Sequence, residues 1–436
     1  MRKNASVKPF LRNAITLVGA GLIGLCPQFV LAQTNSVEPS ISVADVFGQT
    51  PAPSPVIAPA PYGGGDGINS VYVENGDAKL LFEGQAPPGS ENAVNSFEQR
   101  LAAAHARYIG EWSSLPNVSI PAGADMVLGS SGSRVSLLRQ RLGLPEGRTF
   151  DAATAERVRL FRQMHGLSDN SRVDRAMLAA LRRGPAHYTR VLKRNLDHAG
   201  ELPSYLGYRY VHVDLTNQRL QMIEDGRVVD EMAVVAGKPA SPTPIMAGLL
   251  RHAVLKPYWN VPPDLVRATY ARRIINGGSA YLRRTGFEAL SGWDENARVL
   301  PASSVDWRAV ERGESDVRLR QKPGPGNGMG KVKFMFPNAL GIYLHDTASK
   351  HYFAKPERLF SAGCVRVERP QDFGAWLFNG QMPVSNGTPE EQVNLPFPVP
   401  IYITYFTALP DAASPRITYR DDIYSMDKAQ LAQLMR

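Results

Sequence analysis

The stretch YRYVHVDL, residues 208–215, divides the chain into a helical part and a β-rich part. Its valines fall on alternate positions, so one face is apolar, which is typical of a β-strand. Downstream, Asp225-Gly226 separates RLQMIE from RVVDEMAVV, and this pair predicts a tight hairpin. Further strand-like runs are KVKFMF (331–336), GIYLH (341–345) and PIYITYF (400–406).

A charged segment, residues 263–322, interrupts this β-rich part. It includes DLVRATYARRI and VDWRAVERG, which have the character of solvated helices. Long insertions between core elements commonly carry a function of their own, such as covering a binding site. We therefore expect a helical lid over a β core.

Upstream of the β-rich part, residues 126–183 show helical periodicity in three successive segments. Gly166 is placed to end the second helix, and Asp174 can cap the third. A further helical pattern covers about residues 91–112. The three segments are VLGSSGSRVSLLRQRLGL (127–144), FDAATAERVRLFRQMHGL (150–167) and VDRAMLAAL (173–181).

The N-terminal segment has the features of an export signal. Four basic residues precede a 12-residue apolar stretch (14–25), which is shorter than the roughly 20 residues of a membrane span. We expect cleavage after Ala32, with an uncleaved N-terminal anchor as the alternative. The following residues, 33–90, contain PAPSPVIAPAP and predict an extended tether.

Composition constrains the partners and the redox state. The 436 residues carry a formal net charge of +9, which attracts polyanions in general and identifies none of them. The chain has two cysteines, and Cys26 leaves with the signal peptide, so the mature protein keeps only Cys364. An intramolecular disulfide is then impossible, and the single unpaired thiol of an exported protein is a candidate reactive group.

A histidine and this cysteine lie in two neighbouring motifs. The alternation of GIYLH places Tyr343 and His345 on one face of a strand. SAGCVRV follows, with Cys364 nineteen residues after His345 and with Gly363 permitting a tight turn beside the sulfur. A free thiol has a pKa of about 8.5, and a nearby imidazole would favour the nucleophilic thiolate. The pair therefore indicates nucleophilic catalysis.

The sequence YLHDT…SAGCVRV resembles the signature of the L,D-transpeptidases, cysteine enzymes that cross-link peptidoglycan. Similarity continues through GKPASPTP, KPYWNVPP, QKPGPGNGMGKVKFMFPN and YRDDIY, over about 200 residues. The chain is most similar to the larger members that carry a lid, and 126–183 resembles a peptidoglycan-binding domain. It departs from many members by having Ala362 before the glycine. The resemblance implies a multidomain α+β fold with a β-rich, sandwich-like catalytic domain.

The resemblance also implies roles for individual residues. Cys364 would be the nucleophile and His345 its proton acceptor. The backbone N–H of Cys364, with Gly363 and the Tyr343 hydroxyl nearby, would stabilise an oxyanion. Ser361 would position His345 or the loop, or simply close a turn.

Three further residues have two open interpretations each. Arg366 could hold a substrate carboxylate, or it could pair with Asp346 or Glu368. Trp259 and Asn260, before the insertion, could line the substrate cleft, although a tryptophan is more often part of a core.

Other kinds of site are not expected. The glycine-rich run 326–331 imitates a phosphate loop but lacks its spacing and the Ser/Thr after the lysine, so we expect no nucleotide. Without a second cysteine or an HExxH motif we expect no metal and no other cofactor, and an exported protein is not expected to bind nucleic acid.

The function expected from the resemblance is cross-linking in the periplasm or cell wall, with peptidoglycan stem peptides as donor and acceptor. Alternatives are an L,D-carboxypeptidase using the same residues and a non-catalytic wall-binding scaffold. The sequence does not choose between 3→3 and 1→3 linkages and gives no oligomeric state. The expected organisation is signal peptide 1–32, tether 33–90, helical scaffold 91–125, peptidoglycan-binding-like domain 126–183, connecting helix 184–207, catalytic domain 208–408 with insertion 263–322, and C-terminal extension 409–436.

Overall fold

The structure, a computed structural model, describes residues 56–57, 70–71 and 96–427, apart from 204 and 295. The expected signal peptide and most of the expected tether lie outside the described residues. Two short strands, β1 (Val56–Ile57) and β2 (Ser70–Val71), pair with each other. In the part of the chain that is described, no helix has the length and apolar character needed to cross a membrane.

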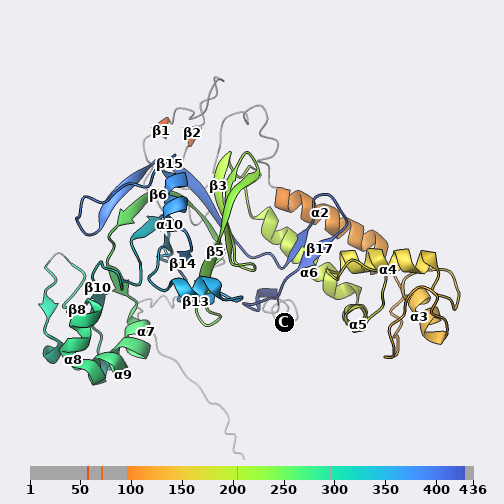
Figure 1. Cartoon of the computed structure of the whole chain (residues 1–436), viewed down its shortest axis with the longest axis horizontal. Coiled ribbons are helices and arrows are strands. Elements are labelled where there is room, and N and C mark those ends of the chain that lie inside the picture. Colours follow the sequence, from red (N-terminus) through yellow and green to blue (C-terminus); the bar gives the residue numbers. More distant parts are fainter. Residues whose placement is uncertain (1–55, 58–69, 72–95, 204, 295, 428–436) are drawn as a thin grey trace, which may run out of the picture. The chain divides into compact units, whose positions relative to one another are not determined.

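The β-rich part forms a nine-stranded sheet with the order β13-β5-β14-β12-β11-β6-β15-β3-β4, and β4 pairs in addition with β5 (Figure 1). This additional pairing closes the sheet on itself. The strands are β3 (Arg209–Asp214), β4 (Arg219–Glu224), β5 (Arg227–Gly237), β6 (Met246–Leu255), β11 (Val332–Met335), β12 (Leu344–His345), β13 (Leu359–Ser361), β14 (Val365–Val367) and β15 (Glu391–Thr404).

Closure depends on the two edges of β5. On one edge Val234 N–H donates to the carbonyl of Gln218, beside β4. On the other edge the carbonyl of Ala233 accepts from the N–H of Glu368, at the end of β14. The expectation of a β-rich domain is confirmed, but a sandwich-like arrangement is wrong, because one strand joins both ends of a single sheet.

The predicted hairpin forms at Asp225 and Gly226, which have φ angles of 51° and 67°. These left-handed conformations are those of a two-residue turn that matches the twist of its strands. Both faces of β3 are buried: Val211 belongs to the core inside the sheet, and Tyr210 packs against Tyr402 outside it. The polar-looking face of YRYVHVDL is therefore also an interior surface. The helix α10 (Pro370–Leu377) contributes Phe373 to the inner core.

The insertion has a hydrophobic core of its own, centred on buried residues such as Ile274 and Leu319. Its strands β8, β9 and β10 join β7, which lies just before the insertion, in a four-stranded sheet of order β7-β10-β8-β9. A purely helical lid was therefore an incomplete expectation: short strands were hidden within charged sequence. The elements are β7 (Trp259–Val261), α7 (Pro263–Leu265), η3 (Val266–Tyr270), α8 (Ala271–Thr285), β8 (Phe287–Leu290), β9 (Val299–Leu300), η4 (Ala302–Ser304), α9 (Trp307–Arg312) and β10 (Arg318–Gln321).

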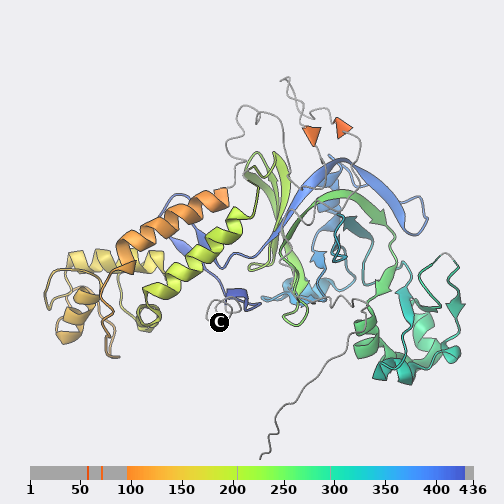
Figure 2. The same cartoon turned by 180° about the vertical axis from the view of Figure 1, so that it is seen from behind.

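The helical part contains the three predicted helices. Asp151 and Asp174 cap two of them by accepting from Thr154 N–H at 2.8 Å and Met177 N–H at 2.9 Å. Two further helices, α2 and α6, lie side by side (Figure 1, Figure 2). The helices are α2 (Ser96–Tyr108), continued by η2 (Ile109–Ser113), then α3 (Ser133–Arg141), α4 (Ala152–Met164), α5 (Arg175–Arg183) and α6 (Pro185–Gly200).

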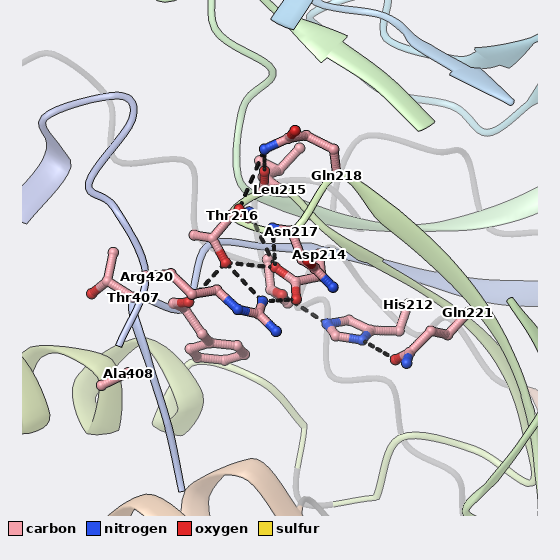
Figure 3. Close-up of polar contacts among 12 residues, drawn as sticks. His212, Asp214, Leu215, Thr216, Asn217, Gln218, Gln221, Thr407, Ala408 and Arg420 are labelled. Atoms are coloured by element: carbon pink, nitrogen blue, oxygen red, sulfur yellow. Dashed lines mark hydrogen bonds and ion pairs between the residues drawn. The ribbon is translucent and has the colours of Figure 1, made fainter. Parts of the chain in front are cut away.

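The C-terminal residues connect the helical part to the closed sheet. The hairpin of β16 (Ala408–Pro410) and β17 (Ile417–Tyr419) contributes Ala408 and Ile417 to the helical core. Residues 420–427, which we call the C-terminal strap, then return to the sheet. Its first residue, Arg420, forms an ion pair with Asp214 and donates to Thr216 at 3.0 Å (Figure 3).

Candidate active site

Two short parallel strands carry both sequence motifs. In the pairing of β12 with β14, Leu344 lies opposite Val365 and His345 opposite Arg366. Leu344 and Val365 are fully buried in the core. Since side chains alternate along a strand, the flanking residues point to the other face. Tyr343, His345, Cys364 and Arg366 therefore share one face, as predicted for the first two, with His345 diagonal to Cys364.

A third strand extends this face with a lysine. β11 runs antiparallel to β12, and Lys333 lies opposite His345. The Lys333 Nζ lies 5.8 Å from the centre of the Tyr343 ring and 3.3 Å from a carboxylate oxygen of Glu390. Positive charge thus flanks His345 on both sides, from Lys333 and from Arg366.

The imidazole of His345 is held in a defined orientation. Only 1% of the residue is exposed, and Nδ1 lies 2.5 Å from the backbone carbonyl oxygen of Asp346. A carbonyl oxygen can only accept, so Nδ1 carries the proton and Nε2 keeps its lone pair. Nε2 has no hydrogen bond to any described residue. Burial, followed by the charge of Arg366, lowers the pKa of His345 to about 3.

Asp346 is itself fixed by its side chain. Its carboxylate accepts from Lys331 N–H at 2.8 Å and from Thr347 N–H at 2.7 Å, and it pairs with Lys350 at 2.7 Å. The carboxylate is therefore occupied away from the imidazole. These contacts position the backbone carbonyl that selects the His345 tautomer.

The Cys364 side chain is half-buried and reduced. Its Sγ lies 3.8 Å from the carbonyl oxygen of Gly341. Burial raises the pKa of the thiol, while hydrogen bonds from Tyr343 and the charges of Arg366 and Lys333 act in the opposite direction. With a low pKa on His345, the resting pair is a neutral thiol and a neutral imidazole. No hydrogen bond joins the two among the described residues, so the increase in thiolate that a nearby imidazole was expected to bring is not favoured in the resting pair.

The turn before Cys364 is fixed by hydrogen bonds to both backbone groups of Gly363, its N–H and its carbonyl. Gly363 has φ = 118°, a conformation that L side chains rarely adopt. Its N–H donates to Ser361 Oγ at 3.2 Å, and its carbonyl accepts from Thr243 Oγ1 at 2.6 Å. Ser361 is buried, and its hydroxyl closes this turn by accepting from Gly363 N–H.

Arg366 is largely buried, and its Nε is a buried nitrogen without a hydrogen-bond partner among the described residues. Burial lowers the pKa of the guanidinium, opposed by the hydroxyls of Tyr352 and Tyr270. The alternative partners are engaged elsewhere: Asp346 pairs with Lys350, and Glu368 accepts from Ala233 N–H at 3.0 Å. The arginine has no carboxylate partner in the described part of the chain.

Residues 208–390 match the model of the YkuD family, the L,D-transpeptidase catalytic domain. This part of the chain is an L,D-transpeptidase domain. A curated protein of Haemophilus influenzae named "Putative L,D-transpeptidase" is 28% identical over 192 residues, which cover 44% of this chain and only 38% of that relative.

Solved structures give weaker likenesses. An L,D-transpeptidase from Mycobacterium smegmatis is 15% identical, with 45% of this chain and 58% of that chain covered and a TM-score of 0.23. An L,D-transpeptidase from Xylanimonas cellulosilytica is 18% identical, with 65% and 99% covered and a TM-score of 0.19. Scores this low carry no structural argument, and the family assignment stands on the sequence match.

Trp259 and Asn260, which were predicted to line the substrate cleft, do not contact the catalytic pair of the L,D-transpeptidase domain in the described structure. Trp259 packs within the insertion, 5.7 Å from the Tyr270 ring and 6.1 Å from the Phe287 ring between centres. Asn260 is exposed on β7, where it pairs with Arg320. No contact in the described part of the chain joins either residue to His345 or Cys364.

Sequence reasoning missed three groups of the L,D-transpeptidase domain. Lys333 was detectable, because KVKFMF alternates and lies just upstream of the histidine strand. The Asp346 carbonyl was not, because a backbone group leaves no mark on residue type. Thr243 lies in GKPASPTP, far from Gly363 in sequence, and only the fold joins them. Within the described residues, no three His, Cys, Asp or Glu side chains gather as a metal ion would require.

Proposed function

We propose that this protein is a peptidoglycan L,D-transpeptidase that works through a thioester on Cys364. The observation that carries the proposal is the shared face of Tyr343, His345, Cys364 and Arg366, with the His345 tautomer fixed by the Asp346 carbonyl. This tautomer leaves Nε2 as the proton acceptor that a thiol nucleophile requires. The matching family supports the same chemistry.

In the first half-reaction, the Cys364 sulfur attacks the carbonyl carbon of the third residue of a donor stem peptide. The thiol proton passes to Nε2 of His345 as the C–S bond forms. The C–N bond to the terminal D-alanine then breaks, and His345 returns the proton to the leaving amine. Because both groups are neutral at rest, proton transfer accompanies attack instead of preceding it.

In the second half-reaction, an amine of an acceptor stem attacks the thioester. His345 takes a proton from this amine, the C–S bond breaks, and the thiolate recovers that proton. One amide replaces another, so the exchange needs no nucleotide. If water takes the place of the amine, the same residues act as a carboxypeptidase.

The developing oxyanion needs donors that are in place before reaction. The backbone N–H of Cys364 makes no hydrogen bond within the described residues and is available for this role. The Tyr343 hydroxyl interacts with Cys364 and also donates to the sulfur of Met329 at 3.4 Å. Burial, followed by the proximity of Cys364, raises the pKa of Tyr343, so the hydroxyl stays protonated and able to donate.

Arg366 and Lys333 provide recognition of an anionic stem peptide. The buried Nε of Arg366 has no partner among the described residues and can donate to an acceptor brought by a ligand, and a carboxylate matches the fork-shaped donors of the guanidinium. Tyr352 lies beside it, with its ring centre 5.8 Å from the guanidinium carbon. The insertion contributes Tyr270, which lies near enough to Arg366 for each group to shift the pKa of the other. In this proposal the insertion acts as a lid over the arginine.

The remaining parts of the protein serve localisation in this proposal. Residues 1–32 direct export, and 33–90 tether the enzyme in the envelope. The helices of 126–183 hold the chain against peptidoglycan, while 91–125, 184–207 and 409–436 form the scaffold that joins this module to the catalytic domain, 208–408.

Product analysis tests the proposal. Purified protein beginning at Gln33 is incubated with disaccharide-tetrapeptide, and products are identified by mass spectrometry. A cross-linked dimer that has lost one D-alanine supports transpeptidation, and fragmentation separates 3→3 from 1→3 linkage. Tripeptide alone would assign hydrolysis, and unchanged substrate from folded protein would favour a non-catalytic wall-binding role.

A further inference from the structure

We propose that Thr243 and Tyr424 are positioning residues that aim the backbone N–H of Cys364 at the reaction centre. They act through the peptide unit between Gly363 and Cys364. The inference rests on the proposed function of Cys364 and adds to it the device that fixes the oxyanion donor.

Thr243 makes the direct contact with this peptide unit. Its side chain is fully buried, and Oγ1 donates to the Gly363 carbonyl at 2.6 Å. The same oxygen accepts from the N–H of Gly237 at 2.9 Å. The hydroxyl proton is therefore directed to Gly363, because the other side of the oxygen is already used as an acceptor.

Peptide planarity converts this contact into an orientation of the catalytic N–H. The Gly363 carbonyl and the Cys364 N–H belong to one planar, trans unit, so they point in opposite directions. Holding the carbonyl fixes the direction of the N–H. Glycine alone would not do this, since it accepts many backbone conformations.

Tyr424, in the C-terminal strap, supports Thr243 from behind. Its hydroxyl donates to the Gly237 carbonyl at 2.6 Å, and the backbone and hydroxyl of Thr243 lie close enough to oppose the rise that burial causes in the pKa of Tyr424. Tyr424 thus touches both residues on which the position of the Thr243 hydroxyl depends. It contacts neither Gly363 nor Cys364 in the described structure, so its effect must pass through Thr243.

The strap that carries Tyr424 is held at both ends. Arg420 pairs with Asp214 in the sheet (Figure 3). Asp427 pairs with Arg194 of α6 at 3.2 Å and accepts from Thr407 at 2.7 Å. The Tyr424 hydroxyl is therefore presented from a segment with little freedom to shift.

Two reactions at the same sulfur separate orientation from general disorder. Acylation by imipenem, a carbapenem, passes through an oxyanion and needs the aimed N–H. Alkylation by iodoacetamide displaces iodide at a saturated carbon, forms no oxyanion and needs only the sulfur. Both adducts are followed by intact-protein mass in the protein beginning at Gln33.

Thr243→Val keeps the shape of the side chain and removes the donor. We expect roughly 10- to 100-fold slower acylation, comparable to weakening one oxyanion-hole donor, with alkylation within about twofold of wild type. Thr243→Ser restores the hydroxyl and should restore acylation. Tyr424→Phe should slow acylation by a smaller factor, roughly 3- to 10-fold, because the threonine remains.

Tyr402→Phe is the matched control. It also removes a phenol that donates to a backbone carbonyl, that of Leu206 at 3.1 Å, and should leave both rates unchanged. Wild-type acylation rates in Thr243→Val, or equal losses of acylation and alkylation, would overturn the positioning role alone. Wild-type protein that is alkylated but never acylated would overturn the proposed function, and the positioning role with it.

Discussion

Two buried histidines of the same closed sheet, His212 on β3 and His345 on β12, differ in their hydrogen bonds. His212 and His345 are 4% and 1% exposed, and burial lowers the pKa of each. Both ring nitrogens of His212 are bonded, to Gln221 Oε1 at 3.1 Å and to Thr404 Oγ1 at 2.8 Å (Figure 3). His345 uses only Nδ1.

Two arginines repeat this difference. Arg420 is paired with a buried carboxylate, Asp214, and supported by a hydroxyl. Arg366 is also largely buried, and its Nε has no partner within the described residues. In these two pairs the structural members, His212 and Arg420, have bonded partners, whereas the two groups that we assign to the site each keep one nitrogen without a partner among the described residues. Burial is therefore common to both members of each pair, and unused hydrogen-bonding capacity is what distinguishes them.

The largest expected difference in acylation rate is between variants of the two histidines. His345→Ala should slow acylation by imipenem roughly 10²- to 10⁴-fold, because it removes the proton acceptor, and should lower the free energy of unfolding less than His212→Ala does, because it strands only the Asp346 carbonyl. His212→Ala should lower the free energy of unfolding by about 1–3 kcal/mol, because it strands the buried Thr404 hydroxyl and removes the partner of the half-buried Gln221, and leave the rate nearly unchanged. Acylation kinetics and thermal denaturation measure both. Equal rate losses in the two variants would remove the distinction.

The next contrast is between the arginines. Arg366→Met should reduce kcat/KM for the stem peptide by roughly 10- to 100-fold through lost carboxylate binding, and leave unfolding unchanged. Arg420→Met leaves Asp214 buried without its cation and should cost about 3 kcal/mol of stability. Adding Asp214→Asn to Arg420→Met should recover part of that loss. An Arg366→Met protein that unfolds as readily as Arg420→Met would make Arg366 structural.

The thiol supplies a smaller contrast, in pH dependence. Burial raises the pKa of Cys364, so iodoacetamide alkylation should increase with pH and reach half its maximum above the ordinary thiol value of about 8.5. Lys333→Met removes a charge that favours the thiolate and should move the midpoint higher. The rate is measured across pH in both proteins. A midpoint below 7 in wild type would show a preformed thiolate–imidazolium pair instead.

Sequence patterns predicted the individual strands and helices better than the closure of the sheet. The alternation in YRYVHVDL and GIYLH identified strands and the shared face of Tyr343 and His345, because period two is a local property. A sandwich-like domain was expected, yet the two edges of β5 close one sheet. Which strand edges pair cannot be predicted from the sequence of any single strand. The protonation of Cys364 and His345 was also outside sequence reasoning, because burial sets it. Thr243 and Tyr424 come from distant segments and were not predicted.

The smallest expected effect concerns the insertion. Its helix α8 is interrupted at Gly278, where φ is 53° and ψ is −151°, although the surrounding segment has its own core. We expect residues 263–322 to exchange amide hydrogens faster than β6 in the free protein and to slow when a stem peptide binds. Hydrogen-exchange mass spectrometry compares the two states. Exchange as slow as that of β6 in both states would make the insertion a fixed structural part.

The central claim is that all covalent chemistry passes through one sulfur. The most direct measurement is the cross-linking of muropeptides by Cys364→Ala protein that is shown to be folded by its circular dichroism and unfolding transition. Replacing a half-buried thiol by a methyl group changes little packing, so we predict a folded protein that forms no dimer and takes up no imipenem, beside an active wild type. Folded Cys364→Ala protein that still cross-links stem peptides would contradict the account and place the activity elsewhere.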